Sequence, residues 1–220
     1  RSVAANGGMY VYTPSLQLIN NEIYKLGRNT SGYARPAVAS NGTIFLADYT
    51  DNGTSGIWVV NPSNLTTCTQ FYDGTRASNG LFTNANGEEI GSSTSGVGVY
   101  GEGANAMLYT MMEDGTNAKA AVAYQIGQQD GSMLKTWSDV PTWICKEFSS
   151  INASTNNAFA ATDKGVWVSQ NDAVDVGSRK ELVFIDKTGI LQFQQDKQKC
   201  QGAGLAVNAD NSKLYISGAS

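Results

Sequence analysis

The sequence repeats one pattern of short apolar segments that are separated by polar turns. In the first complete copy, β-branched and aromatic runs occupy residues 36–40, 43–48, 56–60 and 66–72. Short runs of this composition are typical of β-strands, and the Asn-Gly pair between the first two is typical of a hairpin. The copy therefore predicts four strands joined in antiparallel order.

The pattern recurs along the whole chain. Further copies occupy residues 96–137 and 157–195, and another begins at residue 203 with only two strands. The missing two strands resemble the other end of the chain, because residues 9–15 (MYVYTPS) align with residues 57–63 (IWVVNPS). The repeat units are therefore residues about 34–74, 96–137, 157–195, and 203–220 combined with 8–26.

A four-stranded antiparallel unit at this spacing is typical of the blade of a β-propeller. A blade has two apolar faces, and it buries both only by packing beside other blades around an axis. The first strand of each unit is rich in Ala and Gly, as we expect for the crowded strand nearest that axis. The sequence therefore predicts an all-β fold in one domain, residues 1–220: a β-propeller of four-stranded antiparallel blades.

Two ways of closing such a propeller are compatible with the repeat. Three whole blades and one blade shared between the chain ends would make about four blades. Alternatively, the chain is a piece of a propeller of about six to eight blades, which another chain or domain completes.

Particular segments resemble the blades of NHL and YVTN-type propellers. They are residues 41–48 (NGTIFLAD) with 56–60 (GIWVV), and residues 206–217 (AVNADNSKLYIS). The resemblance covers most of the chain as a repeat pattern. It implies the propeller fold and leaves the activity open, because these families include lactonases, lyases, adhesins and scaffolds. The composition also resembles that of secreted or surface proteins of Bacteroidetes.

The composition excludes several classes of function. The 220 residues include no histidine, so a Ser-His-Asp triad and any His-ligated metal site are ruled out. The net charge of −4 does not favour a nucleic-acid partner, and no apolar run approaches the roughly 18 residues of a membrane span. Only 15% of the residues are charged, and Asn, Gly, Ser and Thr are abundant. This composition favours an extracytoplasmic protein: secreted, periplasmic or on the cell surface.

Acidic turns are the candidate metal site. Asp48, Asp51, Asp114 and Asp210 lie in or beside polar turns, and oxygen-rich clusters of this kind suit Ca²⁺. The resemblance to propeller families that include calcium-dependent lactonases points the same way. Asp is also common in turns because it caps backbone groups, so a structural role is the alternative. Apart from Ca²⁺, no cofactor is expected.

Two tryptophans and two cysteines are further candidates. Trp137 and Trp143 bracket a linker between blades, where a flat ring could cover the apolar face of a sugar. Alternatively, both pack between the second and third blades. Cys145 and Cys200 each precede one of two consecutive repeats, which makes them a candidate disulfide, with two separate buried thiols as the alternative.

These observations favour a non-catalytic secreted or cell-surface propeller module that binds a glycan or a protein partner. A repeat scaffold without convergent titratable residues supports this hypothesis more than an enzymatic one. One alternative is a calcium-dependent hydrolase, lactonase or lyase, since carboxylates and Ca²⁺ are the catalytic groups that a chain without histidine retains. The other alternative is a structural domain of a larger surface protein.

Overall fold

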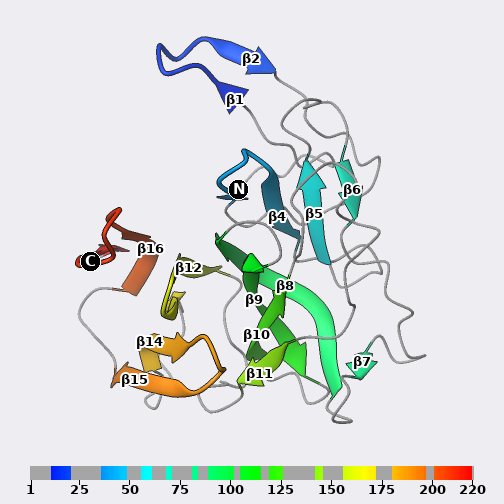
Figure 1. Cartoon of the computed structure of the whole chain (residues 1–220), viewed down its shortest axis with the longest axis vertical. Coiled ribbons are helices and arrows are strands. Elements are labelled where there is room, and N and C mark those ends of the chain that lie inside the picture. Colours follow the sequence, from blue (N-terminus) through cyan, green and yellow to red (C-terminus); the bar gives the residue numbers. More distant parts are fainter. Residues whose placement is uncertain are drawn as a thin grey trace.

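The computed structural model describes twelve segments of the chain, and all their regular structure is β-strand (Figure 1). Among these residues there is no helix long and apolar enough to cross a membrane. The described segments are residues 11–20, 36–48, 56–60, 68–70, 81–83, 89–101, 105–114, 119–125, 142–145, 156–171, 180–196 and 201–219.

Two sheets are four-stranded meanders in which every neighbouring pair is antiparallel. The first consists of β3 (Ala37–Val38), β4 (Ile44–Asp48), β5 (Gly56–Val60) and β6 (Cys68–Gln70). The other consists of β12 (Asn156–Thr162), β13 (Gly165–Asn171), β14 (Lys180–Asp186) and β15 (Leu191–Asp196). The strands predicted from the first and third repeats are confirmed in both number and order.

The second repeat forms a sheet of five strands, in the order β11-β10-β9-β8-β7. Its central strands are β8 (Glu89–Tyr100), β9 (Met107–Asp114) and β10 (Lys119–Gln125). The strand β8 begins earlier than the predicted first strand at residue 96, and its added part pairs with β7 (Leu81–Thr83). The sequence did not predict β7, because the Ser and Gly residues at 91–96 are poor strand formers by themselves.

The strand beside β10 is β11 (Trp143–Cys145). The repeat at residues 96–137 predicted the fourth strand of this unit at its end, and residues 126–141 lie outside the described residues. Burial explains why residues 143–145 form the strand beside β10. Trp143 and Cys145 alternate with Ile144 along the strand, and both bury their side chains. The backbone of Thr142 continues the pairing, with its N–H donating to the carbonyl of Ala123 at 2.7 Å.

Each end of the chain forms a hairpin of its own. β1 (Val11–Tyr12) pairs with β2 (Leu18–Asn20), and β16 (Gln201–Val207) pairs with β17 (Leu214–Ala219). The two hairpins belong to separate sheets (Figure 1), so within the described residues the predicted blade of residues 203–220 with 8–26 is not assembled. The end of the predicted segment 8–26, from residue 21 onward, lies outside the described part of the chain.

The first strands of the units lie side by side. β12 contacts β8 on one side and β16 on the other, and β8 contacts β3 and β4. The approach is close at Gly98 of β8, where an added Cβ would lie only 2.9 Å from the Cβ of Phe159 in β12. The small residues of the first strands therefore permit the contact, as predicted for strands nearest the axis of a propeller.

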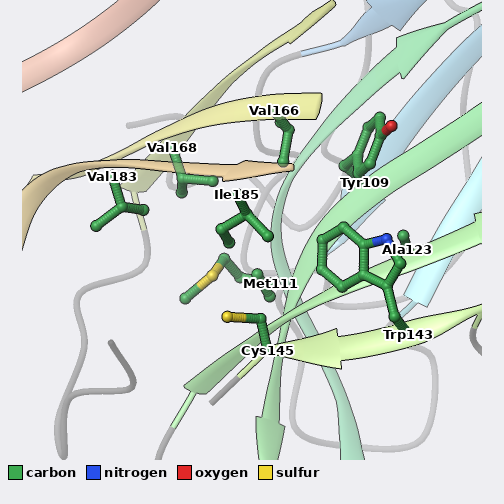
Figure 2. Packing of buried hydrophobic residues seen from close by; sticks show 10 residues of the cluster. Tyr109, Met111, Ala123, Trp143, Cys145, Val166, Val168, Val183 and Ile185 are labelled. Carbon is green, nitrogen blue, oxygen red and sulfur yellow. The ribbon is translucent and has the colours of Figure 1, made fainter. Parts of the chain in front are cut away.

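A cluster of buried residues lies between the second and third blades (Figure 2). Tyr109 and Trp143 pack with ring centroids 5.9 Å apart, and burial raises the pKa of the Tyr109 hydroxyl to about 12. The apolar faces of neighbouring blades thus bury each other, which is the source of stability that the repeat predicts. The buried members are Tyr109, Met111, Ala121, Ala123, Trp143 and Cys145 of the second blade, and Val166, Val168, Val183 and Ile185 of the third.

Candidate functional site

The turns that follow β3, β8, β12 and β16 gather at one end of the molecule, which we call the turn face. Ser40, after β3, lines a common cavity with Tyr100 at the end of β8. Farther round, Asn211 after β16 donates a hydrogen bond to Asp163 after β12. The first strands of the units are therefore parallel to one another, and the loops that leave them form one surface.

The turn after β3 is closed by its own hydrogen bonds. The N–H of Gly42 donates to the carbonyl of Ala39 at 2.9 Å, and the N–H of Thr43 donates to Oδ1 of Asn41 at 3.0 Å. Gly42 has a φ of 86°, a conformation that glycine adopts readily. The Asn-Gly pair predicted to make a hairpin does so, and it leaves Ser40 exposed to solvent.

The turn after β12 is also closed by hydrogen bonds among its own residues. The N–H of Lys164 donates to the hydroxyl of Thr162 at 3.1 Å, and that hydroxyl donates to the carbonyl of Gly165 at 3.0 Å. An added Cβ at Gly165 would meet the backbone of the neighbouring strand, so the position requires glycine. As a result Asp163 and Lys164 are held out into solvent on the turn face.

The turn after β16 contains Asp210, one of the candidate metal ligands. Its Oδ1 accepts hydrogen bonds from the hydroxyl of Ser212 at 2.7 Å and from the N–H of Ser212 at 3.1 Å. The Ser212 hydroxyl is the main reason that the pKa of Asp210 lies below its usual value. This carboxylate therefore serves its own turn, the structural role that the sequence left as an alternative.

A cavity of about 400 Å³ opens on the turn face between the first two blades. The described residues that line it are Ala39, Ser40, Val99, Tyr100 and Gly101. Tyr100 is 39% exposed, which leaves part of its ring and surroundings accessible to a ligand. Cavities of this size hold small molecules, and an aromatic ring beside a hydroxyl group suits a ligand with both apolar and polar faces.

Two of the remaining candidate metal ligands, Asp48 and Asp114, lie at the other end of their blades. Asp48 is the last residue of β4 and Asp114 the last residue of β9, and a second strand ends where the first strand of its meander begins. Asp210 lies beyond the opposite end of a first strand, and a calcium site formed by these residues stays a prediction. Asp51 lies outside the described residues. Among the residues that are described, no three acidic or Cys side chains form a metal-binding group.

Trp143 lies inside the protein. Its side chain is 9% exposed, its Nε1 donates to the carbonyl of Lys187 at 3.2 Å, and Gly189 lies against its ring. The indole therefore packs between the second and third blades, and a sugar would not reach its faces in this arrangement. Trp137 lies outside the described residues, so its role as a ligand-binding residue stays a prediction.

Cys145 belongs to the buried cluster, with 3% of its surface exposed (Figure 2). Its proposed partner, Cys200, lies outside the part of the chain that the structure describes. The disulfide between them therefore stays a prediction.

Tyr100 was not among the site residues predicted from the sequence. The sequence does contain a feature that could have indicated this residue. Tyr100 is a large aromatic residue at the end of a first strand of mostly small residues, and Gly101 follows it directly. The position of Ser40 beside it depends on the packing of two blades, which no local pattern contains.

Comparisons with known proteins identify the fold. No protein family matches the sequence, and no curated protein does. Among solved structures, a gluconolactonase from Xanthomonas campestris is 12% identical, with a TM-score of 0.54 over 96% of this chain and 62% of the other. PorZ, an essential surface component of the type-IX secretion system of Porphyromonas gingivalis, is 15% identical, with a TM-score of 0.52 over 98% of this chain and 28% of the other.

The chain thus spans less than two thirds of either of these proteins. Both likenesses agree with the arrangement of the blades, and the all-β propeller class predicted from the sequence is confirmed. The NHL or YVTN type of the repeat stays a prediction.

Proposed function

We propose that this chain is a propeller-type binding module that acts outside the cytoplasm and holds a glycan in the cavity of the turn face. The observation that carries the proposal is the half-exposed ring of Tyr100 in a cavity of about 400 Å³ between two blades. A protein loop is the alternative occupant.

The lining of the cavity suits a sugar. The apolar C–H face of a sugar ring packs on an aromatic ring, while its hydroxyl groups exchange hydrogen bonds with polar neighbours such as Ser40. The turn that carries Ser40 is closed by three short hydrogen bonds, so this part of the site is held in place before a ligand binds. A rigid site lowers the entropic cost of binding.

An extracytoplasmic location is supported by two observations. The chain has few charged residues and many Asn, Gly, Ser and Thr residues. One of the structures with the same fold, PorZ, is a bacterial surface component.

A glycan array followed by calorimetry on the best ligand tests the proposal. Tyr100→Ala should weaken binding by about tenfold or more, which corresponds to about 1.4 kcal/mol. Tyr100→Phe should retain most of the affinity because the ring remains. Tyr12→Ala is the matched control, since Tyr12 is 52% exposed but lies on the separate β1–β2 hairpin. Binding that survives Tyr100→Ala, or no binding on the array, would contradict the proposal.

A calcium-dependent lactonase is the second candidate, and the likeness to a gluconolactonase favours it. Its site would lie at the end of the blades that carries Asp48 and Asp114. The test is hydrolysis of sugar lactones with added Ca²⁺ and with EDTA. Activity should fall strongly in Asp48→Asn and Asp114→Asn but persist in Asp210→Asn, which changes the opposite end. The absence of calcium-dependent hydrolysis would exclude this candidate.

A further inference from the structure

A leucine occupies the left-handed position of the turn between β1 and β2. The N–H of Thr13 donates to the carbonyl of Gln17 at 2.8 Å, and the N–H of Leu16 donates to the carbonyl of Thr13 at 2.9 Å. Leu16 has a φ of 64°, in a region of backbone conformation that is sterically unfavourable for a bulky side chain. The turn therefore carries a residue that its own backbone disfavours.

Two other turns show which residue this backbone ordinarily takes. The turns after β3 and β14 are closed by hydrogen bonds at the same two spacings as the turn after β1. Their left-handed residues are Gly42 and Gly189, with φ of 86° and 89°. In the described part of the chain the other non-glycine residue with a positive φ is Asn211, and asparagine tolerates this conformation. Leu16 is thus the exception, and glycine would allow the same hydrogen bonds.

The side chain of Leu16 is also open to solvent. It is 81% exposed, the highest value among the large apolar residues of the described segments. The turn that carries it lies at the margin of the molecule (Figure 1). A leucine with this exposure contributes little to the stability of its own chain, because apolar stabilisation is proportional to the area removed from water. Strain and exposure are independent observations, and both indicate that the fold does not require this leucine.

The turn holds Leu16 between polar residues. The hydroxyl groups of Thr13 and Ser15 share a hydrogen bond of 2.8 Å, and the N–H of Gln17 donates to the Thr13 hydroxyl at 3.0 Å. Ser15 and Gln17, on either side of Leu16 in the sequence, are themselves exposed. Leu16 is therefore a preorganised apolar projection with polar neighbours.

A protein surface suits this projection better than a lipid surface does. Protein interfaces combine an apolar centre with a polar rim, and a preorganised anchor residue lowers the entropic cost of binding. Insertion into lipid would bury Ser15 and Gln17 together with Leu16, which carries a desolvation cost. A fluid hydrocarbon phase would also gain nothing from a leucine that is held in one direction.

We propose that Leu16 is the anchor residue through which this chain binds a protein partner. The partner has an apolar pocket of the size of a leucine side chain, and hydrogen-bonding groups around that pocket meet Ser15 and Gln17. Burial of Leu16 in the pocket offsets the conformational cost that the free chain carries. This contact is additional to the glycan site and does not depend on it.

Thermal unfolding tests whether the leucine serves a partner or its own fold. Leu16→Gly should raise the melting temperature by about 2–4 °C, because it removes the unfavourable side chain and allows the same hydrogen bonds in the turn. An unchanged or lower melting temperature would show that the leucine stabilises its own chain, and the proposal would then be wrong.

Photo-crosslinking from position 16 identifies the partner. A benzophenone-bearing amino acid replaces Leu16 in the chain as its native cells produce it. The same amino acid in place of Ile190 is the control, since Ile190 is 55% exposed in the matched turn after β14. We expect a protein that is crosslinked from position 16 and not from position 190. The absence of such a protein would contradict the proposal.

Calorimetry with that protein in purified form then measures the contribution of the anchor. Leu16→Asn suits the backbone conformation and removes the apolar side chain, so it should weaken binding at least tenfold. Leu16→Met and Ile190→Asn should bind almost as the unchanged chain does. Unaltered affinity of Leu16→Asn would overturn the proposal. Co-sedimentation with phosphatidylcholine vesicles that is lost in Leu16→Asn would overturn it in favour of a lipid surface.

Discussion

The side chain of Asn211 donates a hydrogen bond to the carboxylate of Asp163, with Nδ2 and Oδ1 3.1 Å apart, although the residues are 48 positions apart in the sequence. The bond joins the turns after β16 and β12 and so connects two neighbouring units at the turn face. Asn211 adopts a φ of 56°, which Asn tolerates better than most residues. Asn at this position thus both tolerates the backbone conformation of the turn and supplies the side chain that reaches Asp163.

A double-mutant cycle measures this bond. Asn211→Gly removes the amide and keeps the backbone conformation accessible, and Asp163→Ala removes the acceptor. Because both groups are near solvent, we expect a coupling of about 0.5–1 kcal/mol in the free energy of unfolding. Urea unfolding of the four proteins gives this value. Strictly additive effects would show that the bond does not contribute.

Gly189 should tolerate no side chain, because an added Cβ would lie 2.8 Å from Cγ of Trp143. Gly101 is a matched control with nearly the same φ, 92° against 89°, and its nearest contact to an added Cβ is longer, at 3.2 Å. We expect Gly189→Ala to destabilise the protein by about 3 kcal/mol and Gly101→Ala by about 1 kcal/mol. Thermal unfolding compares them. Equal losses would mean that Trp143 does not fill this space.

Asp186 should titrate at unusually low pH. The hydroxyl of Thr188 donates to its Oδ1 at 2.6 Å and is the main reason that its pKa is lowered to about 2. Since the pKa is lower in the folded than in the unfolded chain, the stabilisation is complete above about pH 4 and is lost as pH falls toward 2. Carboxyl ¹³C NMR should show this pKa, and Thr188→Val should raise it. An unchanged pKa in Thr188→Val would refute the assignment.

The interface between the second and third blades should dominate stability. Ile185 is fully buried there, whereas Ile190, five positions later, is 55% exposed. Ile185→Ala should cost about 3 kcal/mol because it leaves a cavity, and Ile190→Ala less than about 1 kcal/mol. Urea unfolding measures both. Similar losses for the two would contradict a core placed between these blades.

Much of the fold could be predicted because its signals are local. The third repeat illustrates this, since short apolar runs between Gly- and Asp-containing turns within residues 157–195 predict the four strands β12 to β15. β11 was not predicted, because a segment as short as Trp143–Cys145 is recognised as a strand only from the cluster that it helps to bury.

The candidate site was less predictable. Asp210 reads in the sequence like a metal ligand, and only its hydrogen bonds to Ser212 show that it closes a turn. The sequence does not mark Tyr100 as a site residue, because its position in a site depends on Ser40, which lines the same cavity from another blade.

The sequence by itself determined that this chain forms short antiparallel strands in repeated units with small residues in the innermost strand. Strand length and turn type depend on residues that are adjacent in the sequence, and the small size of Gly98 or Ala160 can be read directly from it. A local sequence pattern is therefore enough to predict these features. The tertiary structure decided that Trp143 is buried, that Ser40 and Tyr100 line one cavity, and that the β1–β2 hairpin lies in a different sheet from β17. Each of these depends on the packing of residues far apart in the chain, where the burial of apolar surface between blades selects among locally equivalent arrangements.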